Sequence, residues 1–568
     1  MLRTTERRAR PAGLLPGLDL LRHYQRRWLR ADVVAGLTVG AMLIPQSMAY
    51  AELAGLPPEY GFYAVIGALV VYALVGSSRH LGVGPEPGTA ILAATGVSAI
   101  AAGDPERYVA LMAALALVVA AICLVGAVAR LGFLASVLSK PVLVGYITGV
   151  GLTLLSSQIA SFTGVAISSD RFFPRFAELA RELGDVHGAT LALGTGTLLL
   201  MVVLRRVAPR APGALIGVVT ASVVVAAFGL DEHGIAVVGA IPSGLPVPGL
   251  PDVSWGDLGR LLPVAAGIAL VGYADNVLTG RSIAARQGYR IDANQELLAL
   301  GLVNLSAGLS QGFPVSSSAS RTAVPASLGS QTQLVSLLAS GFVVVTLLGL
   351  RSLLAHIPQA ALAAVIVFAA ISIVDVAGYR VLWRVSREEA ALAVAAGLGV
   401  IVFDVLVGVL VGVILSILVA LRHIARPHDA VLGDYPGLDG WVDVAAYPEA
   451  VPEPGLVVYR FDAPLFFVNA DRFRDRVEQA LADSPGDEDW LVLDFEGVGA
   501  LDASALDALA GLRERVAQLG VAVVGVARAN DEVLARLDRA GVVEPAGSVR
   551  VFPTINGAVR AFRERPRP

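Results

Sequence analysis

The sequence predicts a polytopic α-helical membrane protein that ends in a small soluble α/β domain. Of its 568 residues, 55% are hydrophobic and only 16% are charged, and the mean hydropathy is +0.69. Long apolar runs alternate with short polar links from Asp32 to Ile424, and the composition changes after His428. A soluble domain of this size does not have that composition, so the apolar runs are expected to span a membrane.

The first thirty residues carry a strong positive charge. They contain eight arginines before the first apolar run, and they lack the small-residue cleavage site of a signal peptide. Because Lys and Arg accumulate on the cytoplasmic side, we expect segment 1–31 to be cytoplasmic in a multi-pass protein of the cell's inner (plasma) membrane. An even number of spans would return the C-terminus to the cytoplasm.

We expect a transmembrane domain over 32–424 with about fourteen spans, some shorter than the ~20 residues that a bilayer crossing needs. They are placed near 32–54, 61–77, 86–101, 108–129, 141–163, 188–207, 213–230, 261–283, 295–311, 318–331, 332–351, 358–375, 386–403 and 404–423. The single cysteine, Cys123, excludes an internal disulfide, and seven scattered histidines offer no paired spacing for a metal site.

Two short spans occupy the same place in two sets of seven. The third follows the sequence GVGPEPG (82–88), and the tenth lies in a stretch rich in serine and proline, 311–333. Irregular backbone at membrane depth is tolerated only where protein or a water-filled cavity satisfies its polar groups. Matched broken segments in two odd-numbered halves predict an inverted repeat with a midplane site between facing half-helix N-termini.

The second of these stretches contains the strongest candidates for an anion site, Ser318, Ser320 and Arg321. An extended lead-in followed by a helix N-terminus offers free N–H groups, and serine hydroxyls and an arginine there favour a bound anion. The alternative is a solvated loop between two helices. Glu86, which follows Gly84-Pro85, is either a capping carboxylate or a member of the site that shares a proton, since its charge would repel an anion.

Polar residues also share one helical face in the first span of each half. Gln46 and Tyr50 are four residues apart beside Pro45, which can kink the helix, although an interfacial anchor is an alternative for Tyr50. Asp275 and Thr279 are likewise four apart in the eighth span. An acid inside a span marks a functional site by default, here for a coupling proton or a sodium ion. A structural ion pair with Arg281 or Arg321 is the alternative.

The C-terminal part reads as a polar, proline-rich linker, 425–454, and an α/β domain, 455–568. Strands are expected over 456–461, 465–470, 490–495, 521–527 and 549–552, with helices between them. The domain has no phosphate-binding glycine loop and no catalytic constellation, so we expect neither an enzyme nor a cofactor, and no nucleic-acid partner. Ser504, just inside a helix, is a candidate for phosphorylation or for the helix cap, and the residues favour the cap.

Several of these segments together resemble the sulfate permease (SulP) family, also called solute carrier family 26. The resemblance rests on IPQSMAYAELAGLPPEYGFYA (44–64), GSSRHLGVGP (76–85), the acid in GYADNVLTGRSIA (272–284), SSSASRTAV (316–324) and the α/β tail. It implies the seven-plus-seven inverted fold of uracil and bicarbonate transporters, with a mobile core domain, a gate domain and a cytoplasmic STAS domain. It also implies a homodimer whose STAS domain has a possible cytoplasmic protein partner.

The resemblance further implies roles for single residues. It places the anion near Gln46, Tyr50, Ser320 and Arg321, and a coupling ion at the position of Asp275. In a bicarbonate-transporting member of the family, an Asp and a Thr of a sodium site stand at the positions of Asp275 and Thr279. Ser504 matches the phosphorylated serine of anti-sigma factor antagonists, although alanine replaces the usual glycine after it. Glu86 departs from the apolar residue of many members, which leaves the substrate open.

These observations favour a secondary active transporter of inorganic anions. Sulfate uptake coupled to protons by an elevator-type movement is the first expectation, because the Ser-Arg pair resembles that of sulfate carriers. A sodium-coupled bicarbonate transporter is the alternative, and chloride or a small dicarboxylate also remain open as substrates. The competing class is a non-transporting protein, either an anion-responsive membrane protein or a membrane tether for a STAS signalling domain.

Overall fold

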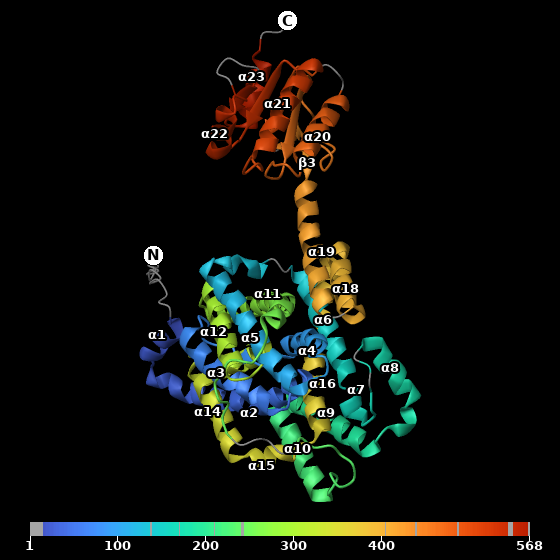
Figure 1. Ribbon diagram of the computed structural model, residues 1–568. Helices are drawn as coiled ribbons and strands as arrows, with labels where there is room; N and C mark the ends of the chain where they lie inside the picture. Colours follow the sequence, from blue (N-terminus) through green and yellow to red (C-terminus); the bar gives the residue numbers. More distant parts are fainter. Residues whose placement is uncertain are drawn as a thin grey trace. The chain divides into compact units, whose positions relative to one another are not determined.

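A computed structural model describes residues 15–565, apart from 137–138, 168, 170, 209–210, 240–243, 404, 438–439, 485–487 and 544–548. Contacts divide the chain into two compact units, Met1–Ser416 and Ile417–Pro568. The first unit is built almost entirely of helices, and the second is a sheet covered by helices (Figure 1).

The helices of the first unit follow the apolar runs of the sequence. They are α2 (Leu29–Leu53), α3 (Glu59–Val75), α4 (Pro87–Ala101), α5 (Pro105–Val128), α6 (Lys140–Ser157), α7 (Ile159–Thr163), α9 (Gly188–Val207), α10 (Gly213–Phe228), α11 (Trp255–Gln287), α12 (Ala293–Leu309), α13 (Ala319–Ser327), α14 (Leu334–Gly349), α16 (Gln359–Ile373) and α18 (Arg387–Val402). Helix α19 (Val405–Ala425) runs from the first unit into the second. Among the described residues, five helical segments are long and apolar enough to cross a membrane. The count of fourteen spans stays a prediction.

Several short helices were not expected from the hydropathy pattern. They are α1 (Pro16–Arg22), α8 (Phe172–Arg181), α15 (Arg351–Ala355) and α17 (Val376–Val385). Helix α11 also begins six residues before the expected span, because Ser254 and Asp257 form a capping box that starts it at Trp255. Local capping chemistry, rather than hydrophobicity, sets this boundary.

The two short half-helices, α4 and α13, each begin directly after a two-residue strand. These two strands form an antiparallel pair, which we call the strand crossing. Strand β1 (Val83–Gly84) leads into α4, strand β2 (Ser316–Ser317) leads into α13, and the two strands pair with each other. Gly84 has a φ of 144°, in the region that favours glycine. A Cβ on Gly82 would lie 2.9 Å from the Cβ of Arg321, so both glycines permit the close approach of the two segments.

Side chains from neighbouring helices complete the hydrogen bonding around this crossing. Asn304 of α12 accepts a hydrogen bond from the Val315 N–H and donates one to the Val315 carbonyl, at 2.9 Å each. Gln333 donates to the carbonyls of Ser78 and Leu81. Irregular backbone buried in a membrane protein needs such partners, because water cannot supply them there.

The GSSRH segment (76–80) before β1 is held in the same way. The buried Glu296 carboxylate accepts hydrogen bonds from the N–H groups of Ser77 and Ser78 and from the Tyr72 hydroxyl. His80 contacts the Ser330 carbonyl at 2.9 Å, which ties the segment to the end of the α13 region. The polar residues of this motif therefore have a structural role in fixing the crossing.

The second unit is a six-stranded mixed sheet with the order β4-β3-β5-β6-β7-β8. Its strands are β3 (Asp429–Asp434), β4 (Trp441–Asp443), β5 (Leu456–Phe461), β6 (Trp490–Asp494), β7 (Val523–Ala527) and β8 (Val549–Phe552). The last four are parallel to one another, and β3 is antiparallel to both of its neighbours. Alternate residues of each strand pack on opposite faces: α20 (Ala470–Ala482), α21 (Ala503–Gln518) and α22 (Asp531–Arg539) cover one face, and α23 (Ile555–Arg563) covers the other.

Two expectations for this unit differ from the structure. Strands β3 and β4 lie inside the 425–454 segment that was expected to be a linker, and β3 pairs directly with β5. The expected strand over 465–470 is wrong. Only Leu465 makes an isolated bridge there, and the Asn469 side chain, which accepts from the Phe466 N–H and donates to the Pro464 carbonyl, holds the following residues in a turn.

A buried carboxylate joins two strands of this sheet to the loop after β7. Asp494 is fully buried, and it accepts hydrogen bonds from Arg460 Nε at 2.7 Å and from Arg528 Nε at 2.9 Å. Burial alone would raise its pKa, but the hydrogen bonds from Arg528 and Arg460 bring the pKa of Asp494 below its ordinary value. The stability that this group contributes is therefore present above the ordinary pKa of about 3.9 and is lost as the pH falls below it.

We expect Asp494→Asn to lower the free energy of unfolding of the isolated second unit (427–568) by about 2 kcal/mol. The loss should be smaller than for a fully buried pair, because both arginines keep about a quarter of their side chains exposed. Urea unfolding followed by circular dichroism measures it. The matched control is Glu532→Gln, which breaks an exposed pair with Arg536 and should change stability by at most about 0.5 kcal/mol. Equal losses in the two variants would contradict the structural role of Asp494.

Candidate anion-binding site

Arg321 is the central residue of the candidate site. It is the third residue of α13, its side chain is 1% exposed, and its Nη1 donates to the Gln46 side-chain oxygen at 3.3 Å. Its Nε and Nη2 groups have no hydrogen-bond partner among the described residues. A buried guanidinium with unpaired N–H groups favours an acceptor that the protein itself does not provide.

The N-terminus of α13, where this arginine lies, has no side-chain cap. Ser318 is the N-cap residue, but its side chain does not cap the helix and lies 3.1 Å from the Ser320 hydroxyl instead. Ser320 is exposed. The first N–H groups of the helix therefore lack a side-chain acceptor, as the sequence predicts for an anion site.

Helix α2 brings the two residues of the first span to the same place. Gln46 is 8% exposed and contacts Arg321, and Tyr50 is 3% exposed, one turn farther along. This burial argues against the alternative of an interfacial anchor for Tyr50.

Glu86 caps the other half-helix. Its carboxylate accepts a hydrogen bond from the Thr89 N–H at 2.9 Å, at the first turn of α4. The capping alternative for Glu86 is therefore what the structure contains. As a consequence, the two facing half-helices differ, because α4 already holds a carboxylate at its positive end and α13 does not.

Asp275 lies between the two half-helices on α11. The Ser317 hydroxyl donates to its carboxylate at 2.9 Å, and Thr279 lies one turn farther along the same helix. The hydrogen-bond partner of Asp275 is therefore a hydroxyl group, whereas the alternative interpretation expected an ion pair with Arg281 or Arg321. Gly272, one turn earlier, lies against Ser316, where an added Cβ would come within 3.3 Å. Together Asp275, Thr279 and Ser317 present several oxygens to one place.

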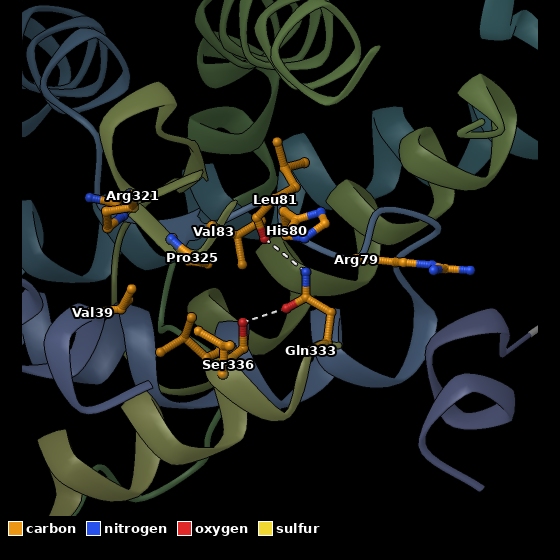
Figure 2. A pocket seen from close by; sticks show the side chains of 12 residues that line it. Val39, Arg79, His80, Leu81, Val83, Arg321, Pro325, Gln333 and Ser336 are labelled. Carbon is orange, nitrogen blue, oxygen red and sulfur yellow. Dashed lines mark hydrogen bonds between the residues drawn. The ribbon is translucent and has the colours of Figure 1, made fainter. Parts of the chain in front are cut away.

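A narrow pocket also borders Arg321, but the side chains of Gln333 and Ser336 in its lining already have hydrogen-bond partners. Figure 2 shows Gln333 between the Leu81 carbonyl and the Ser336 hydroxyl, and both hydrogen bonds are drawn. Much of the remaining lining is apolar, including Val39 and Leu69. We therefore favour the start of α13 over this pocket as the candidate anion site.

In the second unit, Ser504 is not the helix cap. Asp502 caps α21 by accepting from the Ala505 N–H at 2.8 Å, and its other oxygen accepts from the Phe467 N–H. The capping role expected for Ser504 is therefore wrong, because the preceding aspartate occupies that position. Ser504 itself is exposed.

Sequence reasoning missed the residues that position the site. Ser317 was part of the recognised serine run, but nothing in the sequence indicated that it would contact Asp275. Asn304 and Glu296 are polar residues inside an apolar run, and that signal could have identified them. Among the described residues, no group of three His, Cys, Asp or Glu side chains could hold a metal ion.

Comparisons with known proteins agree with this architecture. Residues 29–396 match the model of the sulfate permease family, and residues 447–558 match that of the STAS domain. The chain is 49% identical over 554 residues to a probable sulfate transporter of Mycobacterium tuberculosis, covering 98% of this chain and 99% of that protein. It is 33% identical to probable sulfate transporter 4.2 of Arabidopsis thaliana, covering 96% of this chain and 83% of that protein.

Solved structures give the same result for the fold. Murine Slc26a9, an anion transporter seen in the inward-facing state, aligns with a TM-score of 0.89 at 26% identity, covering 99% of this chain and 97% of that chain. The transmembrane domain of the cyanobacterial bicarbonate transporter BicA aligns with a TM-score of 0.61 at 23% identity over 68% of this chain and 98% of that chain, which is a likeness of fold. On the family match and the close relatives, this chain is a membrane protein that belongs to the sulfate permease (SulP/SLC26) family and carries a C-terminal STAS domain.

Proposed function

We propose that this protein is a secondary active transporter that takes up sulfate together with protons by an elevator-type movement of its core helices. The single observation that carries the proposal is Arg321, a buried arginine with two unpaired N–H groups at the uncapped N-terminus of α13. Guanidinium groups and helix N-termini both bind oxyanions well. The names of the relatives, several of them sulfate transporters, support sulfate as the anion.

The charges around the site favour proton coupling. Sulfate carries two negative charges, and Arg321 supplies one positive charge near the carboxylate of Glu86, which in turn lies near that of Asp275. Moving the loaded site through a membrane costs less when its net charge is small. A proton on Asp275 would offset one charge of the anion during the movement.

Sodium coupling, with bicarbonate as the carried anion, is the second candidate. It is favoured by the oxygen atoms of Asp275, Thr279 and Ser317, which are hard ligands of the kind that suit a hard cation.

We further propose a homodimer with both termini in the cytoplasm. We also propose Ser504 as a phosphorylation site, because its side chain is exposed at the start of α21. The affinity of a cytoplasmic protein that binds the STAS domain would then depend on the phosphorylation of Ser504.

We expect Arg321→Ala to weaken sulfate binding by about 10- to 100-fold, because a charged hydrogen bond to the anion is lost. Arg321→Lys should recover only part of this, since the planar fork is absent. Uptake of radiolabelled sulfate into liposomes measures the change. Arg205→Ala, which removes an exposed arginine that donates to Ser372, is the control and should transport normally. Normal uptake by Arg321→Ala would exclude the site, and no flux of any tested anion by the wild type would favour the non-transporting class.

The two coupling mechanisms separate at Thr279. Thr279→Val removes a sodium ligand but leaves the Asp275 carboxylate, so uptake driven by a pH gradient without sodium should be retained if protons are coupled. Asp275→Asn should abolish gradient-driven accumulation under either mechanism. Thr346→Val, which removes a hydroxyl bonded only within its own helix, is the control. Wild-type uptake that requires sodium, and its loss in Thr279→Val, would contradict proton coupling.

A further inference from the structure

Tyr146 is a buried hydroxyl without a partner at the edge of the candidate site. It lies in α6, its side chain is 5% exposed, and its hydroxyl forms no hydrogen bond with any residue that the structure describes. Buried polar groups in folded proteins are nearly always hydrogen-bonded, so an unpaired phenol requires an acceptor from elsewhere. The sequence offered no signal for it, because the tyrosine sits in an ordinary apolar span.

The hydroxyl faces the first turn of α4. A Cβ placed on Gly88 would stand 3.3 Å from the Tyr146 oxygen and 3.0 Å from Glu86 Oε2. The absence of a side chain at Gly88 therefore leaves space between the phenol and the capping carboxylate. Although both groups border this glycine, they form no hydrogen bond with each other. The phenol therefore lies beside the capped first turn of α4 without a hydrogen-bond partner among the described residues.

Tyr146 comes from a different group of helices than the rest of the site. Helix α6 packs mainly against α18 and α16, and Gly145 allows close contact, because an added Cβ would come within 2.0 Å of the Ala393 carbonyl. Helix α4 instead packs mainly against α11 and α5. The phenol therefore reaches the site from helices other than those that carry Arg321, Gln46 and Asp275.

We propose that Tyr146 is a further binding residue of the anion site, which donates its phenolic hydrogen to an oxygen of the carried oxyanion. This inference rests on the proposed function. Among the buried donors that lack a partner in the described part of the chain, the Tyr146 hydroxyl lies beside α4, and the Nε and Nη2 groups of Arg321 lie at α13. An oxyanion such as sulfate has acceptor oxygens that point in several directions, so it can accept hydrogen bonds from both Tyr146 and Arg321. A halide is a single small ion and is less able to reach both donors. The substrate class is therefore an oxyanion in preference to a halide.

Equilibrium binding of radiolabelled sulfate to the purified full-length protein in detergent tests this inference. We expect Tyr146→Phe to raise the Kd for sulfate about 3- to 10-fold, the effect of one lost hydrogen bond, and to leave competition by chloride unchanged. Tyr379→Phe is the matched control, because that phenol donates to the Ala393 carbonyl instead, and it should bind sulfate normally. Thermal unfolding of each variant checks that the phenylalanine is accommodated.

A second comparison identifies the acceptor. If the hydroxyl binds the anion, Tyr146→Phe should raise the Kd by the same factor in a Glu86→Gln background. The inference would be overturned by an unchanged Kd in Tyr146→Phe or by an equal loss of chloride binding. It would also be overturned if the effect of Tyr146→Phe disappeared in the Glu86→Gln background, because the hydroxyl would then be assigned to the Glu86 side chain. Unchanged sulfate binding in Arg321→Gln would instead show that the proposed function itself is wrong.

Discussion

The antiparallel pairing of β1 with β2 is the constraint on which the first unit depends. Each strand has only two residues, and each leads directly into a half-helix, so their pairing fixes where both helix N-termini begin. Backbone groups in this position cannot rely on water, and the side chains of Asn304, Gln333 and Glu296 supply the hydrogen bonds that the short strands cannot make. A rigid frame of helices and buried polar side chains thus presents two positive helix ends to one place.

The two helix ends are nevertheless chemically different. At α4, Glu86 occupies the position that an anion would take, and its carboxylate is held by the Thr89 N–H. At α13, Ser318 leaves the helix uncapped and Arg321 keeps two N–H groups unpaired. In an inverted pair of half-helices, one positive end can therefore be left free for an exchangeable anion, while the positive end of the other is neutralised by a carboxylate of the protein itself. This difference is the reason that Arg321, and not the N-terminus of α4, is the centre of the proposed anion site.

The second unit is stabilised by a different arrangement of charge. Its sheet buries apolar side chains on both faces, and Asp494 accepts hydrogen bonds from two arginines at the end of β6. The cost of burying that carboxylate is offset only because both arginines are in place. Ser504 stands apart from this cluster on the exposed start of α21, where Asp502 has taken the capping role. A modification there would therefore change the surface charge without removing a cap from the fold.

The sequence was enough to identify the class of the protein, because hydropathy and charge are properties of single segments. It determined the apolar runs, the two broken segments, Arg321 at the start of a half-helix and the α/β character of the tail. Which groups meet is known only from the folded chain: Ser317 contacts Asp275, Glu86 caps α4, and strands β3 and β4 lie where a linker was expected. These outcomes depend on contacts between residues far apart in the chain, which local periodicity and capping signals do not encode. Tyr146 shows this most clearly, since an unpaired hydroxyl becomes evident only when its surroundings are known.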